Sequence, residues 1–184
     1  EVHDLIAGAP RHAINLRELV QRMGRELVAA TDEDERASRF RVAGPDVRVP
    51  PVQAAALAMI LQELFANSIK HGVLSAGRGK VELEWNCAAA DGPCGERGLE
   101  LVWVESDGPR AARNAKGAGI GLRLIEGLAR SELRGDAVFS FESPGYVCRI
   151  EALLSPEAGT DGGPSGERGV RGSASSVSYV HGAA

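Results

Sequence analysis

Hydrophobic and polar positions repeat along this chain with a helical period in three places. Residues Asn15 to Ala30 place apolar side chains at helical spacing, which predicts an amphipathic helix with one buried face. A longer helix is predicted from Val52 to His71, because the preceding proline pair suits a helix start and Gly72 suits a helix stop. A third helix is predicted from Ile120 to Leu133.

Between these helices the pattern is typical of β-strands, with alternating or continuous apolar residues bounded by turn residues. The predicted strands are a short pair around Gly44-Pro45-Asp46, a hairpin of Val81 to Trp85 with Leu99 to Glu105, and a final hairpin of Val138 to Phe141 with Tyr146 to Leu154. Antiparallel hairpins between helices favour helices packed on one face of a mixed sheet over a doubly wound parallel sheet. The predicted fold class is therefore an α/β (α+β) two-layer sandwich with a mixed, largely antiparallel sheet.

These elements give a domain organisation with one globular unit, from residue 15 to residue 154. Residues 1–14 are interpreted as an N-terminal segment, a remnant of a linker to a missing dimerisation domain, because the chain begins at Glu1 rather than Met. Residues 155–184 are rich in Gly, Ser and Ala with few large apolar side chains, so a disordered tail is expected.

Charge and composition exclude several classes of partner. The chain has 21 Lys and Arg against 25 Asp and Glu, a formal net charge of -4, and both signs are interspersed. Without a basic stripe, a nucleic-acid partner is not expected. Apolar runs such as Ala54 to Leu61 are shorter than a membrane span and no signal peptide is present, so we expect a cytoplasmic protein. The spacing of Cys87, Cys94 and Cys148 predicts reduced thiols rather than disulfides or a structural metal.

One candidate site lies late in the long predicted helix. At about 100° per residue, Glu63, Asn67, Lys70 and His71 share one polar face. Asn67 can ligate Mg²⁺, Lys70 or His71 can meet phosphate oxygens, and Glu63 can orient or deprotonate a reacting group. A solvated helix face is the alternative, and for His71 a cap at the helix C-terminus is equally consistent.

A second candidate site lies where a predicted strand ends. The carboxylate of Glu105 can accept a hydrogen bond from the amino group of adenine, which would give base selectivity. In the alternative interpretation Asp107-Gly108-Pro109 is only a turn and Trp103 is a core aromatic residue. The two interpretations of Trp103 are compatible.

A third candidate site is the glycine-rich segment that opens the last helix, with Gly117, Gly119, Ile120, Gly121 and Leu122. Glycines allow close approach of the backbone to a polyphosphate, and the N–H groups of a helix start favour anions. The spacing is G-x-G-x-G and not that of a dinucleotide fold, no Walker lysine follows, and a loop of about a dozen residues separates it from the preceding strand. A Rossmann fold is therefore rejected.

Together, the three motifs resemble the ATP-binding domain of sensor histidine kinases in the GHKL ATPase group, specifically the HWE subgroup. The resemblance covers about Leu16 to Leu154, with His71 as the histidine of the subgroup and Trp103 with Glu105 as its W-x-E signature. It implies a Bergerat-type sandwich that binds ATP with Mg²⁺.

The resemblance also implies a role for each candidate residue. Asn67 ligates Mg²⁺, Glu63 assists catalysis, Lys70 and His71 contact phosphates, and Glu105 takes the adenine-binding acidic position. The glycines 117, 119 and 121, with Ile120 and Leu122, lie near the phosphates, and residues 106–118 form a mobile ATP lid. The chain has Asp107-Gly108-Pro109 where the subgroup usually has Gly-Gly-Pro, so the adenine contact stays open between Glu105 and Asp107.

The activity implied by the resemblance is transfer of the γ-phosphoryl group of ATP to a histidine on a domain outside this chain, and onward to an aspartate of a response regulator. His12 lacks the pattern of such an acceptor. Two alternatives have the same fold: a histidine phosphotransfer adaptor with a decayed nucleotide site, and an anti-sigma-factor serine kinase. Intact Glu63 and Asn67 disfavour the adaptor, and the W-x-E signature disfavours the serine kinase.

Overall fold

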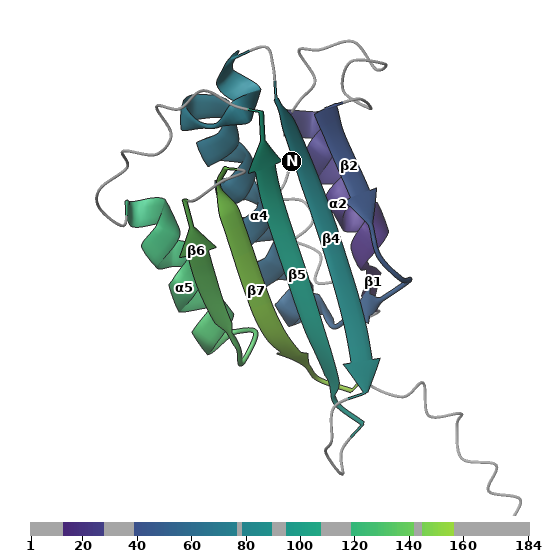
Figure 1. Ribbon diagram of the computed structural model, residues 1–184. Helices are drawn as coiled ribbons and strands as arrows, with labels where there is room; N and C mark the ends of the chain where they lie inside the picture. The colour runs from purple at the N-terminus through teal and green to yellow at the C-terminus, as the bar shows by residue number, and fades with distance from the viewer. Residues whose placement is uncertain are drawn as a thin grey trace, which may run out of the picture.

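A five-stranded sheet with helices on one face forms the body of the computed structural model (Figure 1). The structure describes residues 13–27, 39–76, 79–89, 95–107, 119–141 and 145–156. Within these ranges the α-helices are α2 (Leu16–Leu27), α4 (Pro51–His71) and α5 (Ile120–Ser131), and the short 3-10 helix η1 (Val73–Ala76) follows α4. In Figure 1 the three α-helices lie behind the sheet, with α4 between α2 and α5.

The helices begin and end near the predicted positions. Pro51 is the first residue of α4, where a missing N–H costs nothing because that group has no partner within the helix. At the other end, the Gly72 N–H donates to the carbonyl oxygens of Asn67 and Ser68 at 3.1 and 3.0 Å. Residues 28–30, the predicted end of the first helix, lie outside the described residues.

The sheet is mixed and largely antiparallel, which confirms the predicted fold class. Its strands follow the order β2-β4-β5-β7-β6, and only the pairing of β2 with β4 is parallel among these neighbours. Both predicted hairpins are present as antiparallel pairs. The strands are β2 (Phe40–Ala43), β4 (Lys80–Ala89), β5 (Arg97–Ser106), β6 (Asp136–Ser140) and β7 (Val147–Leu154).

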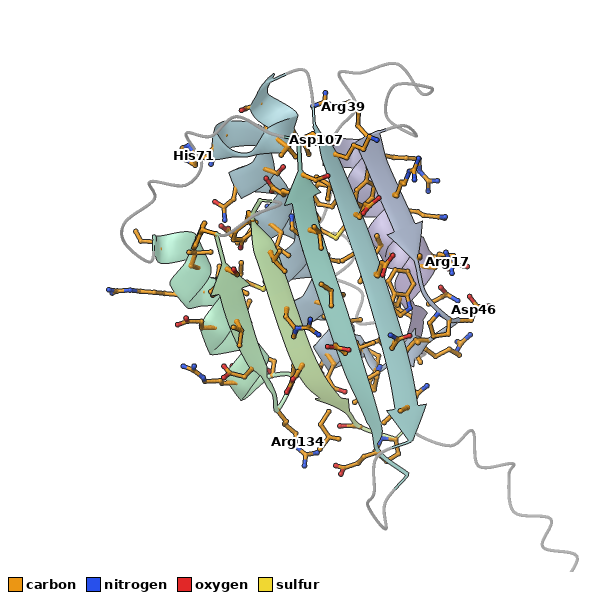
Figure 2. The ribbon with its side chains drawn as sticks, viewed as in Figure 1. Arg17, Arg39, Asp46, His71, Asp107 and Arg134 are labelled. Atoms are coloured by element: carbon orange, nitrogen blue, oxygen red, sulfur yellow. The ribbon has the colours of Figure 1, made fainter. Side chains whose placement is uncertain are left out.

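The stretches on either side of Gly44-Pro45 do not pair with each other, which differs from the prediction of a strand pair. β2 joins the main sheet, whereas β3 (Arg48–Val49) pairs antiparallel with β1 (Ile14–Asn15). The indole of Trp85 on β4 contacts the turn between them, where its Nε1 donates to the Pro45 carbonyl at 2.8 Å. Arg17 covers the same ring at 5.3 Å and pairs with Asp46 at 3.8 Å (Figure 2).

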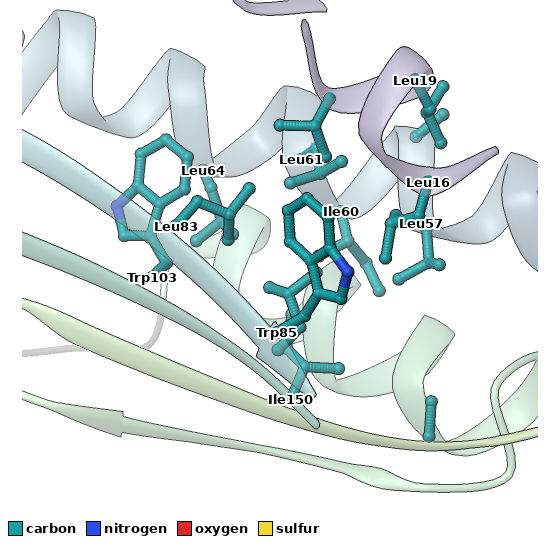
Figure 3. Packing of buried hydrophobic residues seen from close by; sticks show 14 of the residues in the cluster. Leu16, Leu19, Leu57, Ile60, Leu61, Leu64, Leu83, Trp85, Trp103 and Ile150 are labelled. Carbon is teal, nitrogen blue, oxygen red and sulfur yellow. The ribbon is translucent and has the colours of Figure 1, made fainter. Parts of the chain in front are cut away.

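The core lies between α4 and the sheet (Figure 3). Trp103 is fully buried, and its ring packs edge-on against Phe65 with 4.9 Å between ring centroids. The interpretation of Trp103 as a core aromatic residue is therefore confirmed. Although α4 has the length and apolar composition of a membrane span, its apolar side chains here pack on the sheet as those of a core helix do.

Contacts of the fold extend beyond each predicted domain boundary. Ile14 belongs to β1 and packs against the core, and the N–H of Ser155 donates to Gln53 Oε1 at 2.8 Å. Most of the predicted N-terminal segment, and the tail from residue 157 onward, lie outside the described residues. Of the described cysteines, Cys87 is half-buried and Cys148 is buried, and both are free thiols.

Candidate functional site

The last turns of α4 carry the polar face that the sequence predicts. Glu63 and Asn67 are half-buried, and Lys70 and His71 are exposed at the end of the helix. Among the residues that the structure describes, the side chains of Glu63 and Asn67 form no hydrogen bond. Both side chains are therefore available to a ligand.

The first turn of α5 lies directly against this polar face. A Cβ built on Gly121 would be 2.8 Å from Glu63 Oε2 and 3.5 Å from Asn67 Nδ2, so only a glycine fits here without displacing the carboxylate. The N-cap of the helix, Gly119, offers no side-chain cap, and the first N–H groups of a helix have no partner within it. Two segments 50 to 60 residues apart in the chain thus converge, which joins a carboxylate and an amide to an anion-favouring helix start.

The other residues of the glycine motif differ in their surroundings. Gly119 is exposed with open space around it, and Ile120 is 90% exposed. Leu122 is half-buried and packs against the core, so it anchors the first turn of α5 to the protein. Of the predicted lid at residues 106–118, Ser106 belongs to β5 and Asp107 follows it, whereas residues 108–118, with Gly108 and Gly117, lie outside the described residues.

The end of β5 holds the predicted adenine-binding carboxylate in a buried position. Glu105 is 3% exposed, and its two oxygens already accept hydrogen bonds. Trp103 Nε1 donates to Oε1 at 3.2 Å, and the backbone N–H of Val73 donates to Oε2 at 3.1 Å. The W-x-E residues are thus in contact with each other, and they tie β5 to the segment that follows α4.

Asp107 has the properties expected of a residue that stands in for glycine. Its backbone has a φ of 58°, in the left-handed region that glycine adopts most readily and Asp tolerates better than most residues. The side chain is exposed, and it lies at the same end of the molecule as Arg39 and His71 (Figure 2). The departure from Gly-Gly-Pro therefore places an exposed carboxylate directly after the end of β5.

Two hydroxyl groups are buried beside this site: among the described residues, Ser68 Oγ has no hydrogen-bond partner, and Tyr146 Oη has only the weak acceptor thiol of Cys148 near it. Ser68 follows Asn67 on α4, and the carbonyl of Tyr146 accepts a hydrogen bond from the Glu105 N–H at 2.8 Å. Burial, with smaller contributions from Cys148 and Glu105, raises the pKa of the Tyr146 phenol above its ordinary value, so this group stays a neutral hydroxyl. Buried hydroxyls normally have a partner, which a bound molecule or water can supply.

Comparison with known proteins identifies relatives of this chain. No protein-family model matches the sequence. A blue-light-activated histidine kinase of Brucella ovis is 30% identical over 121 residues, which cover 66% of this chain and 24% of that protein. The chain is related to the histidine kinases. A blue-light-activated histidine kinase of Brucella anthropi is 31% identical over 119 residues, covering 65% of this chain and 23% of that protein, so the chain spans about a quarter of these relatives.

The histidine kinases also share the fold. The histidine kinase domain of the Erythrobacter litoralis EL346 blue-light activated histidine kinase aligns with a TM-score of 0.53 at 17% identity, covering 81% of this chain and 67% of that chain. A match at this identity concerns the fold alone. It agrees with the two-layer sandwich that the motifs predict for a histidine kinase domain.

The chemistry of the Glu63 and Asn67 site fits a magnesium nucleotide. In the part of the chain that the structure describes, no cluster of three or more His, Cys, Asp or Glu side chains could hold a metal ion. Mg²⁺ is usually held by one or two protein oxygens together with substrate phosphates and water, and this demand matches Asn67 and Glu63 beside Gly121. The residues present are therefore suited to a metal that arrives with its nucleotide.

Sequence reasoning missed several residues at this end of the histidine kinase fold. Arg39 is 9% exposed, and its Nη2 donates to the Val73 carbonyl at 3.0 Å. Ser68 and Tyr146 were not singled out either, and nothing in their spacing marks them. Gly72 was predicted as a helix stop, but its contact with Glu105 was not predicted. A Cβ on Gly72 would be 2.3 Å from Glu105 Oε2.

Proposed function

We propose that this chain is the catalytic ATP-binding domain of a sensor histidine kinase of the HWE type. The observation that carries the proposal is the contact of Gly121 with Glu63 and Asn67, because it joins the polar helix face to the glycine-rich helix start. A solvated helix face, the alternative interpretation, does not explain why a second helix begins against it. Kinship with the histidine kinases supports the same conclusion.

Each side chain has a role that follows from its position. The amide oxygen of Asn67 ligates Mg²⁺, and the cation neutralises charge on the phosphate oxygens when it is bound. The N–H groups at the start of α5 bind phosphate oxygens, with Lys70 and His71 as exposed donors from α4. The adenine base is recognised at the end of β5, where Glu105 and Asp107 are the two carboxylates.

The proposed reaction is phosphoryl transfer from ATP to a histidine of a phosphoacceptor domain outside this chain. The bond between the γ-phosphorus and the bridging oxygen breaks, a bond from phosphorus to an imidazole nitrogen forms, and ADP leaves. Glu63 orients the imidazole and takes its proton. Positioning and charge neutralisation account for most of the catalysis in such a transfer. The phosphoryl group then passes to an aspartate of a response regulator in the cytoplasm.

Calorimetric titration with ATP, in the presence and absence of Mg²⁺, tests the binding part of this proposal. We expect ATP to bind with Mg²⁺ and to bind more weakly when the metal is chelated. No heat of binding under either condition would contradict a nucleotide site and favour the adaptor with a decayed site.

The type of phosphorylated product tests the kinase part. Incubation with ATP and candidate acceptor domains should give a phosphoprotein whose label is lost in acid, since a phosphorus–nitrogen bond is acid-labile. An acid-stable label on serine would instead identify the anti-sigma-factor type of kinase.

A further inference from the structure

The peptide groups that flank Val73 are held from both sides by buried charged residues. The Val73 N–H donates to Glu105 Oε2 at 3.1 Å, and the Val73 carbonyl accepts from Arg39 Nη2 at 3.0 Å. Arg39 also donates through Nε to the Gly79 carbonyl at 3.3 Å. We name Glu105, Trp103 and Arg39 the Val73 clamp.

The clamp acts on the end of α4 that carries the candidate binding residues. Val73 is separated from His71 by Gly72 alone, and the Gly72 N–H closes the last turn on the carbonyls of Asn67 and Ser68. A Cβ on Gly72 would be 2.3 Å from Glu105 Oε2 and 2.7 Å from the Ser68 Cα, so helix and carboxylate are in close contact here. Any shift of Glu105 would therefore move the last turn of α4.

The orientation of the Glu105 carboxylate is itself fixed. Trp103 is fully buried between Phe65 and Phe40, and its Nε1 donates to Oε1 at 3.2 Å. With Val73 bonded to Oε2, each oxygen has a donor from the protein, and only 3% of the residue is exposed. Both oxygens of this carboxylate are thus bonded within the protein, so a base would have to share an oxygen with Trp103 or Val73 at a buried position.

We infer that Glu105 is a positioning residue, which together with Trp103 and Arg39 sets the placement of Asn67, Lys70 and His71, and that the base is not read through Glu105. This inference rests on the proposed function. It assigns the W-x-E pair to the geometry of the phosphate-binding helix.

Binding of ATP and of inosine triphosphate distinguishes a positioning residue from a residue that reads the base. Inosine triphosphate carries an oxygen where adenine carries its amino group, so a residue that accepts from that amino group discriminates between it and ATP. For Glu105→Gln we expect the affinities for ATP and inosine triphosphate, each with Mg²⁺, to fall by the same factor, about tenfold. The ratio of the two affinities should stay as in the unmodified chain.

Trp103→Phe keeps an aromatic ring in the core and removes the donor together with part of the indole, so it should lower both affinities in parallel by a smaller factor. Trp85→Phe is the matched control, because it also removes a buried indole hydrogen bond, to Pro45, but on β4 away from the end of α4. It should lower the midpoint of thermal unfolding and leave both affinities unchanged. Amide exchange at Val73, followed by NMR, should accelerate in Glu105→Gln and not in Trp85→Phe.

A shift of the affinity ratio towards inosine triphosphate by tenfold or more in Glu105→Gln would overturn the inference, and so would unchanged affinities in Trp103→Phe. If Glu105→Gln does not fold, Trp103→Phe decides alone. Failure of the proposed function has a different signature: the unmodified chain would bind neither nucleotide.

Discussion

The two ends of α4 hold polar side chains in opposite states. Near its start, Gln53 is 4% exposed and its amide is fully engaged, since Nε2 donates to the Leu153 carbonyl and Oε1 accepts from the Ser155 N–H, both at 2.8 Å. Near its end, Glu63 and Asn67 are half-buried and form no side-chain hydrogen bond among the described residues. A satisfied polar group holds the fold together, whereas an open one is available to a ligand.

This difference shows why polarity along a helix does not by itself mark a site. Gln53 connects α4 to the end of β7 by a hydrogen bond between residues 100 positions apart, so its role is structural. Glu63 and Asn67 gain a role from the glycine that faces them on α5. If the comparison is right, substitutions at one end of α4 change stability and those at the other end change binding.

Asn67→Ala should have the largest effect. Loss of the amide removes a ligand of Mg²⁺, and we expect the affinity for ATP with Mg²⁺ to fall by more than about 100-fold, with the free energy of unfolding little changed. Calorimetry measures the affinity, and Gln62→Ala, an exposed neighbour on α4, is the control. Unchanged affinity in Asn67→Ala would refute the magnesium assignment.

Gln53→Ala tests the start of α4, where the polar side chain is bonded within the fold. The Leu153 carbonyl and the Ser155 N–H would lose their partner, so the free energy of unfolding should fall by about 2 kcal/mol while ATP affinity stays the same. Urea unfolding measures this change, with Val52→Ala, 68% exposed in the unmodified chain, as the control. A loss of ATP affinity without a loss of stability would contradict the structural role of Gln53.

Gly121→Ala tests the contact between the two helices. The added methyl group would lie 2.8 Å from Glu63 Oε2 and displace that carboxylate, so ATP affinity should fall by about tenfold. Gly127 has no atom within 4 Å of an added Cβ, so Gly127→Ala on the same helix is the matched control. That control should leave affinity unchanged and raise the free energy of unfolding by about 0.5–1 kcal/mol. Equal affinities for the two variants would exclude the proposed phosphate site.

Asp107→Gly should have the smallest effect. Glycine relieves the left-handed backbone but loses more entropy on folding, so the free energy of unfolding should change by about 0.5 kcal/mol or less. Removing one negative charge near the triphosphate should raise ATP affinity by about twofold at low salt, and the gain should vanish at high salt. Asp46→Asn removes a charge far from this end and serves as the control (Figure 2). A large fall in ATP affinity in Asp107→Gly would instead show that this carboxylate reads the base.

Much of the fold could be predicted from the sequence because its elements follow local patterns. The stripe of Leu57, Ile60, Leu61 and Leu64 on α4 is fully buried, as its spacing predicts. The two hairpins follow from alternating strands with turn residues between them. The parallel pairing of β2 with β4 could not be predicted, because it joins segments that are distant in the sequence and no local pattern marks it.

Part of the candidate site was also within reach of the sequence. Helical spacing puts Glu63 and Asn67 on one face, and a glycine cluster before a helix suggests an anion site. The roles of these residues stay predictions until nucleotide binding is measured. Arg39 could not be found, because no local pattern marks a guanidinium that ends up buried against Val73, 34 residues away.

By itself, the sequence determined the helices, the hairpins, the core stripe and the residues with the right chemistry, because these depend on the order of neighbouring side chains. The tertiary structure alone decided which of those side chains are hydrogen-bonded within the protein and which are available to a ligand. Glu105 is the clearest case, since its carboxylate is held by a backbone N–H 32 residues away. Hydrogen-bond partners are set by packing between distant segments, and packing is not a property of any local pattern.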